Sequence, residues 1–349
     1  MSLQQLKVIK VRQEVNEVIT IILQPVNGEK PTYKAGQFLT MSFRMGDKEI
    51  RRSYSVYSSP LVDEPLAIAV KLVENGEISR LLHHSLRMGD LVEVAEPNGM
   101  FFYEPEDLER IIFLFGAGVG ITPLYSILKT ALVGEKKSKI VLIYSSRSAD
   151  QTLFLEELKQ WENIYPDRFK LINLFSNAKN LLRARLNGFL VRELIKEQQP
   201  FVKENALFYT CGPVDYMDVC RISILGAGYQ PHQIKRETFV LPEDEIDEDD
   251  ATEKVVDKNT YSVNLMFLGE TYHLQVPWPK SILEVALENK IKIPYSCSGG
   301  VCSTCTATCI SGGVRMGYNE VLTDDEIARG RVLVCTGRPT ENDTTITWG

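Results

Sequence analysis

The chain has 349 residues, of which 44% are hydrophobic and 24% are charged, and its formal net charge is −7 at pH 7. This length predicts two or three domains rather than one small core. The negative charge argues against nucleic acid or an anionic membrane as a partner, because both attract basic surfaces. The amino terminus carries no apolar signal region, and we therefore expect a cytoplasmic protein.

Residues 1–104 have the pattern of an antiparallel β-barrel. After a first strand at the amino terminus, short strand-like runs separated by glycine and proline are expected over 17–25, 34–43, 51–59, 65–73 and 90–97. One helix, beginning near Ile78, is expected to interrupt them.

Residues 105–240 alternate between strand-like and helix-like segments, which predicts a doubly wound α/β domain with a parallel sheet. The apolar stretch 111–128 is long enough on paper for a membrane helix. Three glycines and a proline interrupt it, however, and its first five residues are typical of a buried parallel strand. We therefore expect no membrane span here.

Residues 241–258 contain nine acidic residues and two lysines, a composition typical of a solvated linker. We expect this linker to leave the following unit mobile or able to dock in more than one way; an acidic docking tail is the alternative. Residues 259–349 are expected to form a third unit of mixed α and β structure, with strands over 261–269 and 271–278 and a helix over 281–290.

Five of the seven cysteines fall in this third unit. Cys297, Cys302 and Cys305 have C-x4-C-x2-C spacing, and Cys335 follows after 29 residues. This is the plant-type spacing for the four thiolate ligands of a 2Fe–2S cluster. The serines and glycines between them allow backbone N–H groups to approach the sulfurs. Structural zinc and free buried thiols are the alternatives, although zinc sites usually use two C-x2-C pairs and only one is present; Cys309 is expected to be a core residue.

Two loops of the α/β domain are candidates for a nicotinamide nucleotide site. GAGVGITP, residues 116–123, follows an apolar strand and opens a helix, where a helix N-terminus and close backbone approach suit a diphosphate. CGP, residues 211–213, ends a later strand, so both loops are expected at the carboxyl edge of the sheet. The residues concerned are Gly116, Ala117, Gly118, Val119, Gly120, Thr122, Cys211, Gly212 and Pro213.

The segment RRSYS, residues 51–55, is a candidate flavin-binding strand. The Arg52 guanidinium suits a pyrophosphate, and the Tyr54 ring can stack on another ring. Gly76 and Ser79 lie at a helix start, where free N–H groups suit an anion. By itself, RRSYS is equally consistent with an ordinary edge strand.

Taken together, these motifs resemble the ferredoxin–NADP reductase superfamily over residues 1 to about 240, and AGQF (35–38) and GDLVEVAEPNGMF (89–101) add to the resemblance. Residues 259–349 resemble plant-type ferredoxins, which implies a β-grasp-like fold. The order of barrel, nucleotide domain and ferredoxin resembles the reductase components of multicomponent oxygenases, most closely the reductase subunits of phenylacetyl-CoA epoxidases.

The resemblance implies an FAD site in the barrel. Tyr54 would stack on the flavin ring, and Ser55 would form a hydrogen bond near the flavin N5 atom. The pyrophosphate would be held by Arg52, Ile78 and Ser79, and the remaining barrel residues assigned to cofactor binding are Val70, Lys71 and Gly76.

The resemblance also implies where the nicotinamide meets the flavin. Thr122 and Cys211 would border this place, and Glu237 and Phe239 would close the other side of the flavin. NADPH, or alternatively NADH, would deliver a hydride to FAD, and the 2Fe–2S cluster would pass single electrons to a separate oxygenase. The flavin is needed because a nicotinamide delivers two electrons whereas the cluster accepts one.

The choice between NADPH and NADH depends on the residues that meet the adenosine ribose. Ser146 and Arg147 end a predicted strand and suit a 2′-phosphate, and no acid stands directly at the strand end. Asp150 lies three residues further on, and Asn177 stands where NADPH-using relatives often have arginine. We predict NADPH; a solvated Arg147 loop residue is the alternative.

Three other functions remain open from the sequence. The chain could be the flavin and iron–sulfur subunit of a dihydroorotate dehydrogenase, although those subunits use a more compact cluster motif. It could serve a desaturase or another hydroxylase. It could also be a non-enzymatic redox sensor, against which the intact RRSYS, GAGVGITP and CGP motifs argue.

Overall fold

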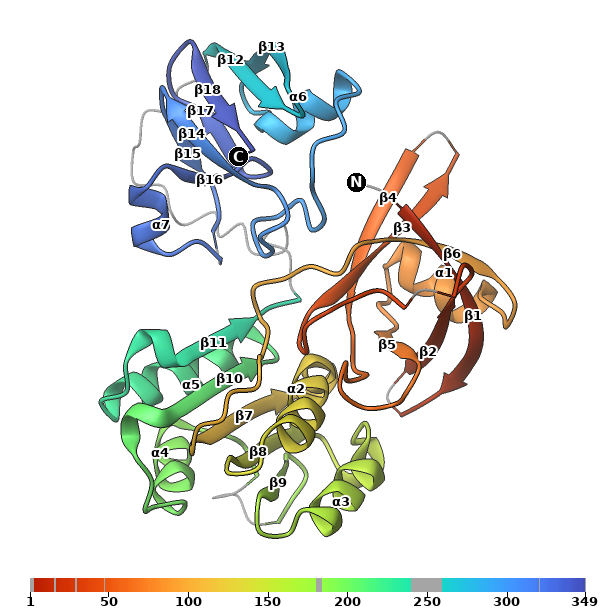
Figure 1. The fold of residues 1–349 in the computed structure, drawn as a ribbon, viewed down its shortest axis with the longest axis vertical. Helices are drawn as coiled ribbons and strands as arrows, with labels where there is room; N and C mark the ends of the chain where they lie inside the picture. The colour runs from red at the N-terminus through yellow and green to blue at the C-terminus, as the bar shows by residue number, and fades with distance from the viewer. Residues whose placement is uncertain are drawn as a thin grey trace.

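The computed structural model describes residues 3–15, 17–28, 30–46, 48–179, 184–239, 259–319 and 321–348, and these residues form three units (Figure 1). The expected linker, 241–258, lies outside the described residues, and so does the expectation about its mobility.

The first unit is the expected antiparallel barrel. Its strands pair in the order β4-β3-β6-β1-β2-β5, and a bridge between Val56 and Ile68 joins the two ends of the sheet. Ile78 and Leu82 of the single helix pack into the barrel core. The elements are β1 (Leu3–Gln13), β2 (Val18–Pro25), β3 (Phe38–Met45), β4 (Lys48–Ser55), β5 (Leu66–Lys71), α1 (Glu77–Ser85) and β6 (Leu91–Ala95).

The second unit is the expected doubly wound domain, with a parallel sheet in the order β11-β10-β7-β8-β9. Its strands are β7 (Ile111–Ala117), β8 (Lys139–Ser146), β9 (Phe169–Phe175), β10 (Ala206–Cys211) and β11 (Ile234–Glu237). Its helices are α2 (Ile121–Gly134), α3 (Leu155–Ile164), α4 (Gly188–Lys196) and α5 (Val214–Gly226), and a 3-10 turn, η1 (Gly118–Gly120), precedes α2.

The apolar run IIFLF in β7 is buried on both faces of this sheet, as expected for a central parallel strand. Ile112 and Leu114 pack with α2 and α3, whereas Phe113 and Phe115 pack with α4 and α5, because successive strand side chains point to opposite faces. The stretch 111–128 is therefore a strand, a turn and part of a helix. No helix among the described residues is long and apolar enough to cross a bilayer.

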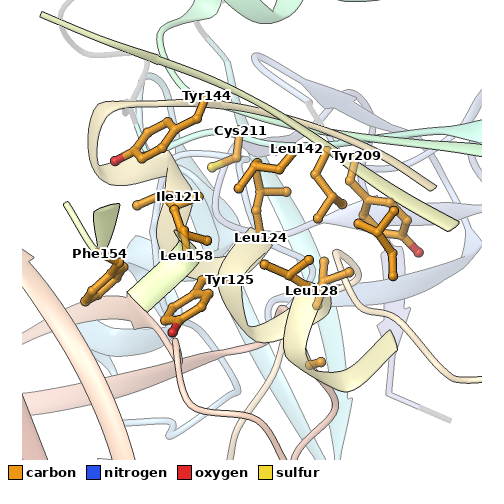
Figure 2. Packing of buried hydrophobic residues seen from close by; sticks show 14 of the residues in the cluster. Ile121, Leu124, Tyr125, Leu128, Leu142, Tyr144, Phe154, Leu158, Tyr209 and Cys211 are labelled. Atoms are coloured by element: carbon orange, nitrogen blue, oxygen red, sulfur yellow. The ribbon is translucent and has the colours of Figure 1, made fainter. Parts of the chain in front are cut away.

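The barrel and the nucleotide domain share one hydrophobic core. Ala35 and Phe101 of the barrel unit pack in the same buried cluster as Leu124 and Leu128 of α2. Figure 2 shows the α2 side of this cluster, in which Ile121 and Leu124 lie close to Cys211. The shared core fixes the barrel against the carboxyl end of the parallel sheet.

The third unit has a mixed sheet in the order β13-β12-β18-β14-β16, and α6 packs its apolar residues against the core of this unit. Ser281 and Glu284 form a capping box that starts α6. The segment 331–339 divides into two short strands, with Cys335 between them. The elements are β12 (Thr260–Phe267), β13 (Glu270–Pro277), α6 (Ile282–Glu288), β14 (Thr306–Ser311), β15 (Val314–Met316), α7 (Asp324–Ala328), β16 (Arg331–Leu333), β17 (Gly337–Pro339) and β18 (Thr344–Thr347).

Candidate redox site

The four cysteines with cluster spacing lie together in the structure. Cys297 contacts Cys302 and Cys335, and Cys335 also contacts Cys305, although these pairs are up to 38 positions apart and none forms a disulfide. The neighbouring Cys297 thiol, followed by burial, raises the pKa of Cys302. Cys309 lies on β14, partly buried against the core of the third unit, as expected for a packing residue.

The loop between these cysteines directs backbone N–H groups toward sulfur. The Gly299 N–H donates to Cys297 Sγ at 3.4 Å, and the Gly300 amide donates to Cys335. Gly300 has φ of +78°, and a Cβ there would collide with the Tyr318 carbonyl oxygen, so glycine is required at this position.

The donor set therefore fits a 2Fe–2S cluster. Among the described residues, no group of three or more His, Cys, Asp or Glu side chains is arranged to bind a single metal ion. A 2Fe–2S cluster is held differently, by four thiolates shared between two irons. Four adjacent thiols with amide donors match that requirement, and Cys297, Cys302, Cys305 and Cys335 are the residues that would hold it.

The two glycine-containing loops of the nucleotide domain meet at the carboxyl edge of its sheet. A Cβ on Gly120 would collide with the backbone of Cys211, and one on Gly212 would lie 2.9 Å from Ala117 Cβ. Small residues are therefore needed at both loops. Two tyrosines outside the motifs brace the first loop: Tyr216 Oη donates to the Gly116 carbonyl at 3.1 Å, and Tyr144 Oη donates to the Gly118 carbonyl at 3.0 Å.

Three predicted residues align at the ends of neighbouring strands. Cys211 of β10 pairs in register with Gly116 of β7 on one side and with Glu237 of β11 on the other. Burial, followed by the Glu237 charge, raises the pKa of the Cys211 thiol. Burial, followed by the Cys302 sulfur, raises the pKa of Glu237, so the end of β11 lies near the cysteine loop.

The predicted flavin residues Tyr54 and Ser55 end strand β4, whose Ser53 bonds to Ser296 at the start of the cysteine loop. Tyr54 packs against the barrel core, and burial raises the pKa of its hydroxyl. Ser55 is buried, and its Oγ has no hydrogen-bond partner among the described residues. A buried hydroxyl without a partner fits a ligand atom that would supply one, and this is the observation that supports a flavin here.

The predicted pyrophosphate residues divide between two roles. Ser79 Oγ is used within its own turn, because it accepts from the Val73 N–H at 3.1 Å and donates to the Gly76 carbonyl at 3.1 Å. A pyrophosphate here would therefore meet the backbone N–H groups of the first turn of α1 rather than the Ser79 hydroxyl, and Arg52 is exposed. Ile78 and Val70 are buried in the barrel core.

Lys71, which the sequence assigned to cofactor binding, faces the nucleotide domain. It lines a 430 Å³ cleft between the barrel and the nucleotide domain, together with Ser146, Arg147, Val119 and Gly118. Glu17, which the sequence reasoning missed, lines the same cleft, whereas Asp150 does not. No local pattern identifies Glu17, because it reaches the cleft only through the packing of the barrel.

Two further predicted residues lie outside this cleft lining. Thr122 Oγ1 donates to the Val119 carbonyl at 3.0 Å, and Phe239, which follows β11, is 45% exposed.

Comparison with known families matches each unit in turn. Residues 7–103 match the oxidoreductase FAD-binding domain, residues 114–221 the oxidoreductase NAD-binding domain, and residues 266–340 the 2Fe–2S iron–sulfur cluster binding domain. A curated relative, one of the subunits of the 1,2-phenylacetyl-CoA epoxidase of Escherichia coli K12, is 31% identical over 98% of this chain and 96% of its own length. The chain belongs to the flavin and iron–sulfur reductases of oxygenase systems. Its cofactors are accordingly FAD, a 2Fe–2S cluster and a nicotinamide nucleotide.

Other members of this reductase family extend the comparison. The ferredoxin reductase component of 3-ketosteroid-9-alpha-monooxygenase from Rhodococcus rhodochrous is 32% identical over 89% of this chain and 86% of its own. The solved structure of phthalate dioxygenase reductase has a TM-score of 0.62 at 24% identity, covering 99% of this chain and 98% of that chain. This structural likeness supports the three-unit fold.

Proposed function

We propose that this protein is cytoplasmic, oxidises NADPH and passes the electrons through FAD and the 2Fe–2S cluster to a separate oxygenase of the phenylacetyl-CoA epoxidase type. When bound, FAD supplies the conversion of a two-electron hydride into single electrons. The observation that carries the proposal is that the cysteine loop meets both of the other units. Ser296 at its start bonds to Ser53 of β4, the strand that carries Tyr54 and Ser55, and Cys302 lies near Glu237, which pairs with Cys211 at the sheet edge.

The residues at this meeting point have separate proposed roles. The unpartnered Ser55 hydroxyl would orient the flavin, and the Tyr54 ring would cover one of its faces. Cys211 and Thr122 would border the nicotinamide, and Glu237 would close the opposite side. Burial of Cys211 and of the Glu237 carboxyl group excludes water from the place where hydride moves.

NADPH rather than NADH is supported by the charge of the cleft. Arg147 and Lys71 line it together with Ser146 and outnumber the one acid in its lining, Glu17, which suits a 2′-phosphate. Arg147→Ala should lower kcat/KM for NADPH at least tenfold and change kcat/KM for NADH less than threefold. Arg221→Ala, which removes an exposed arginine of α5 that does not line the cleft, is the matched control. A wild-type preference for NADH contradicts this part of the proposal.

The electron path itself is tested by anaerobic titration of the fully loaded protein with NADPH, following flavin and cluster absorbance separately. We expect both chromophores to be reduced, the cluster after the flavin. Reduction of the flavin without the cluster would overturn the proposed path.

The epoxidase-type partner is supported by the epoxidase relative, which is 31% identical over 98% of this chain and 96% of its own length. Reconstitution with the oxygenase subunits of a phenylacetyl-CoA epoxidase should couple NADPH oxidation to epoxide formation. Coupling to a ketosteroid hydroxylase alone would reassign the partner.

A further inference from the structure

Strand β4 of the barrel presents different residues on its two faces. Because strand side chains alternate, Arg52 and Tyr54 lie on one face and Arg51 and Ser53 on the other. Tyr54 packs against the barrel core at the flavin site. The second face makes contacts with residues of the third unit, which is about 240 positions away in sequence.

Arg51 contacts the residue that begins the cysteine loop. Its guanidinium carbon lies 4.4 Å from the ring centroid of Tyr295, and its Nη1 donates to the Tyr295 carbonyl at 3.3 Å. The Arg51 side chain is only 12% exposed, so this cation–π contact is largely shielded from water. Tyr295 stands two residues before Cys297, so the contact fixes the position where the loop begins.

Glu49 holds the Arg51 side chain in this orientation. Its Oε1 accepts from Arg51 Nε at 2.7 Å and from Ser42 Oγ at 2.9 Å. Burial acts to raise the pKa of Glu49, but these hydrogen bonds and the charges of Arg51 and Lys292 outweigh it, and the pKa is lowered. Lys292 belongs to the third unit and is thus a further electrostatic link between the two units.

A second contact joins three hydroxyl groups. Thr40 and Ser53 face each other across β3 and β4, and their oxygens lie 3.1 Å apart. Ser296 Oγ forms hydrogen bonds with both, at 2.8 Å to Thr40. Since each hydroxyl can donate once and accept twice, the three can form a closed ring. Thr40 and Ser296 are each 4% exposed. Removing Ser296 would therefore cost the hydroxyls of Thr40 and Ser53 a buried hydrogen-bond partner.

We propose that Arg51 and Ser53 form a docking seat for the ferredoxin unit, which receives Tyr295 and Ser296 and thereby positions the cluster loop beside the flavin. The same strand would hold the flavin on one face and the cluster loop on the other, with adjacent residues only about 3.3 Å apart along its axis. Arg51 and Tyr295 are positioning residues, because they act through the loop that carries Cys297.

This inference rests on the proposed electron path. The step concerned transfers one electron from the flavin, reduced by NADPH, to the oxidised cluster. No covalent bond forms or breaks in the protein.

The test is anaerobic stopped-flow mixing of the loaded full chain with NADPH, with flavin and cluster absorbance followed separately. Arg51→Ala and Tyr295→Leu should each slow cluster reduction at least tenfold while flavin reduction stays within twofold of the wild type. Tyr295→Phe keeps the ring and should remain within threefold. Arg44→Ala removes an exposed arginine from the neighbouring strand β3 and is the matched control.

A second experiment measures the docking of the ferredoxin unit independently of electron transfer. Hydrogen–deuterium exchange of the backbone around 293–297 should be faster in Arg51→Ala than in the wild type, with β12 and β13 unchanged. An unchanged cluster reduction potential would show that the slower transfer arises from position. If cluster reduction and exchange are the same in all variants, the docking seat is refuted while the electron path stands. If NADPH does not reduce the flavin of the wild type, the proposed function itself fails.

Discussion

Replacing Glu135 should strongly destabilise the combined barrel and nucleotide domain. Glu135 follows α2 at its carboxyl end, and its side chain is 1% exposed. It forms an ion pair with Arg110, which is 7% exposed, and accepts hydrogen bonds from Tyr103 and Ser138 and, at 2.8 Å, from the Glu106 N–H. The network joins the end of the barrel, the segment before β7 and α2.

The expected loss in the free energy of unfolding follows from the charge of Arg110, which stays buried when the Glu135 carboxylate is removed. Glu135→Ala leaves the buried Arg110 guanidinium with only the longer, 3.5 Å contact to the 58% exposed Glu106 carboxylate. Breaking a buried pair costs about 3–5 kcal/mol, and we expect the lower end of this range. Urea unfolding followed by circular dichroism at pH 7 measures the loss. Glu156→Ala is the control, because Glu156 pairs with Lys159 where the side chains are 75% and 49% exposed; about 0.5 kcal/mol or less is expected.

The stability difference between the wild type and Glu135→Ala should depend on pH. Burial acts to raise the pKa of Glu135, but hydrogen bonds from Arg110, Ser138, Tyr103 and the Glu106 amide outweigh it, so the folded pKa lies below the ordinary value of 4.5. The stabilisation from the ionised carboxylate is therefore complete above 4.5 and is lost as pH falls through the lower folded pKa. The difference between wild type and Glu135→Ala should be constant from pH 7 to about pH 5 and shrink in stronger acid. A loss below about 1 kcal/mol at pH 7 would refute the reasoning.

Two further substitutions test the cofactor sites. Cys335→Ser should abolish the cluster, measured as loss of bound iron and of visible absorbance. Cys309→Ser should retain both, because Cys309 lies on β14, outside the cysteine loop. Equal iron content in the two variants would contradict the ligand assignment. Gly120→Ala should weaken nicotinamide nucleotide binding at least tenfold by equilibrium titration, because its Cβ would collide with the Cys211 backbone. Gly118→Ala, where a Cβ would meet open space but φ is +55°, should cost less.

Much of the fold follows from local patterns. The alternation of strands and helices predicted the parallel sheet, and the short runs punctuated by glycine and proline predicted the barrel. The spacing of Cys297, Cys302, Cys305 and Cys335 predicted the cluster family, because cluster ligands must fall within a short loop and one returning segment. The roles assigned to single flavin and nicotinamide residues stay predictions that the experiments above address.

Other features were decided only by the tertiary structure. Period-two alternation separates Arg51 from Arg52 on β4, but it does not reveal that Tyr295, 244 positions away, lies over Arg51. The sequence assigned Lys71 to cofactor binding, but only the packing of the barrel against the nucleotide domain places it in the same cleft as Ser146 and Arg147. The sequence by itself determined which local structures form and which thiols can ligate iron, since periodicity and spacing are properties of neighbouring residues. The structure decided which faces meet, because burial of apolar surface depends on the whole chain and not on any one segment.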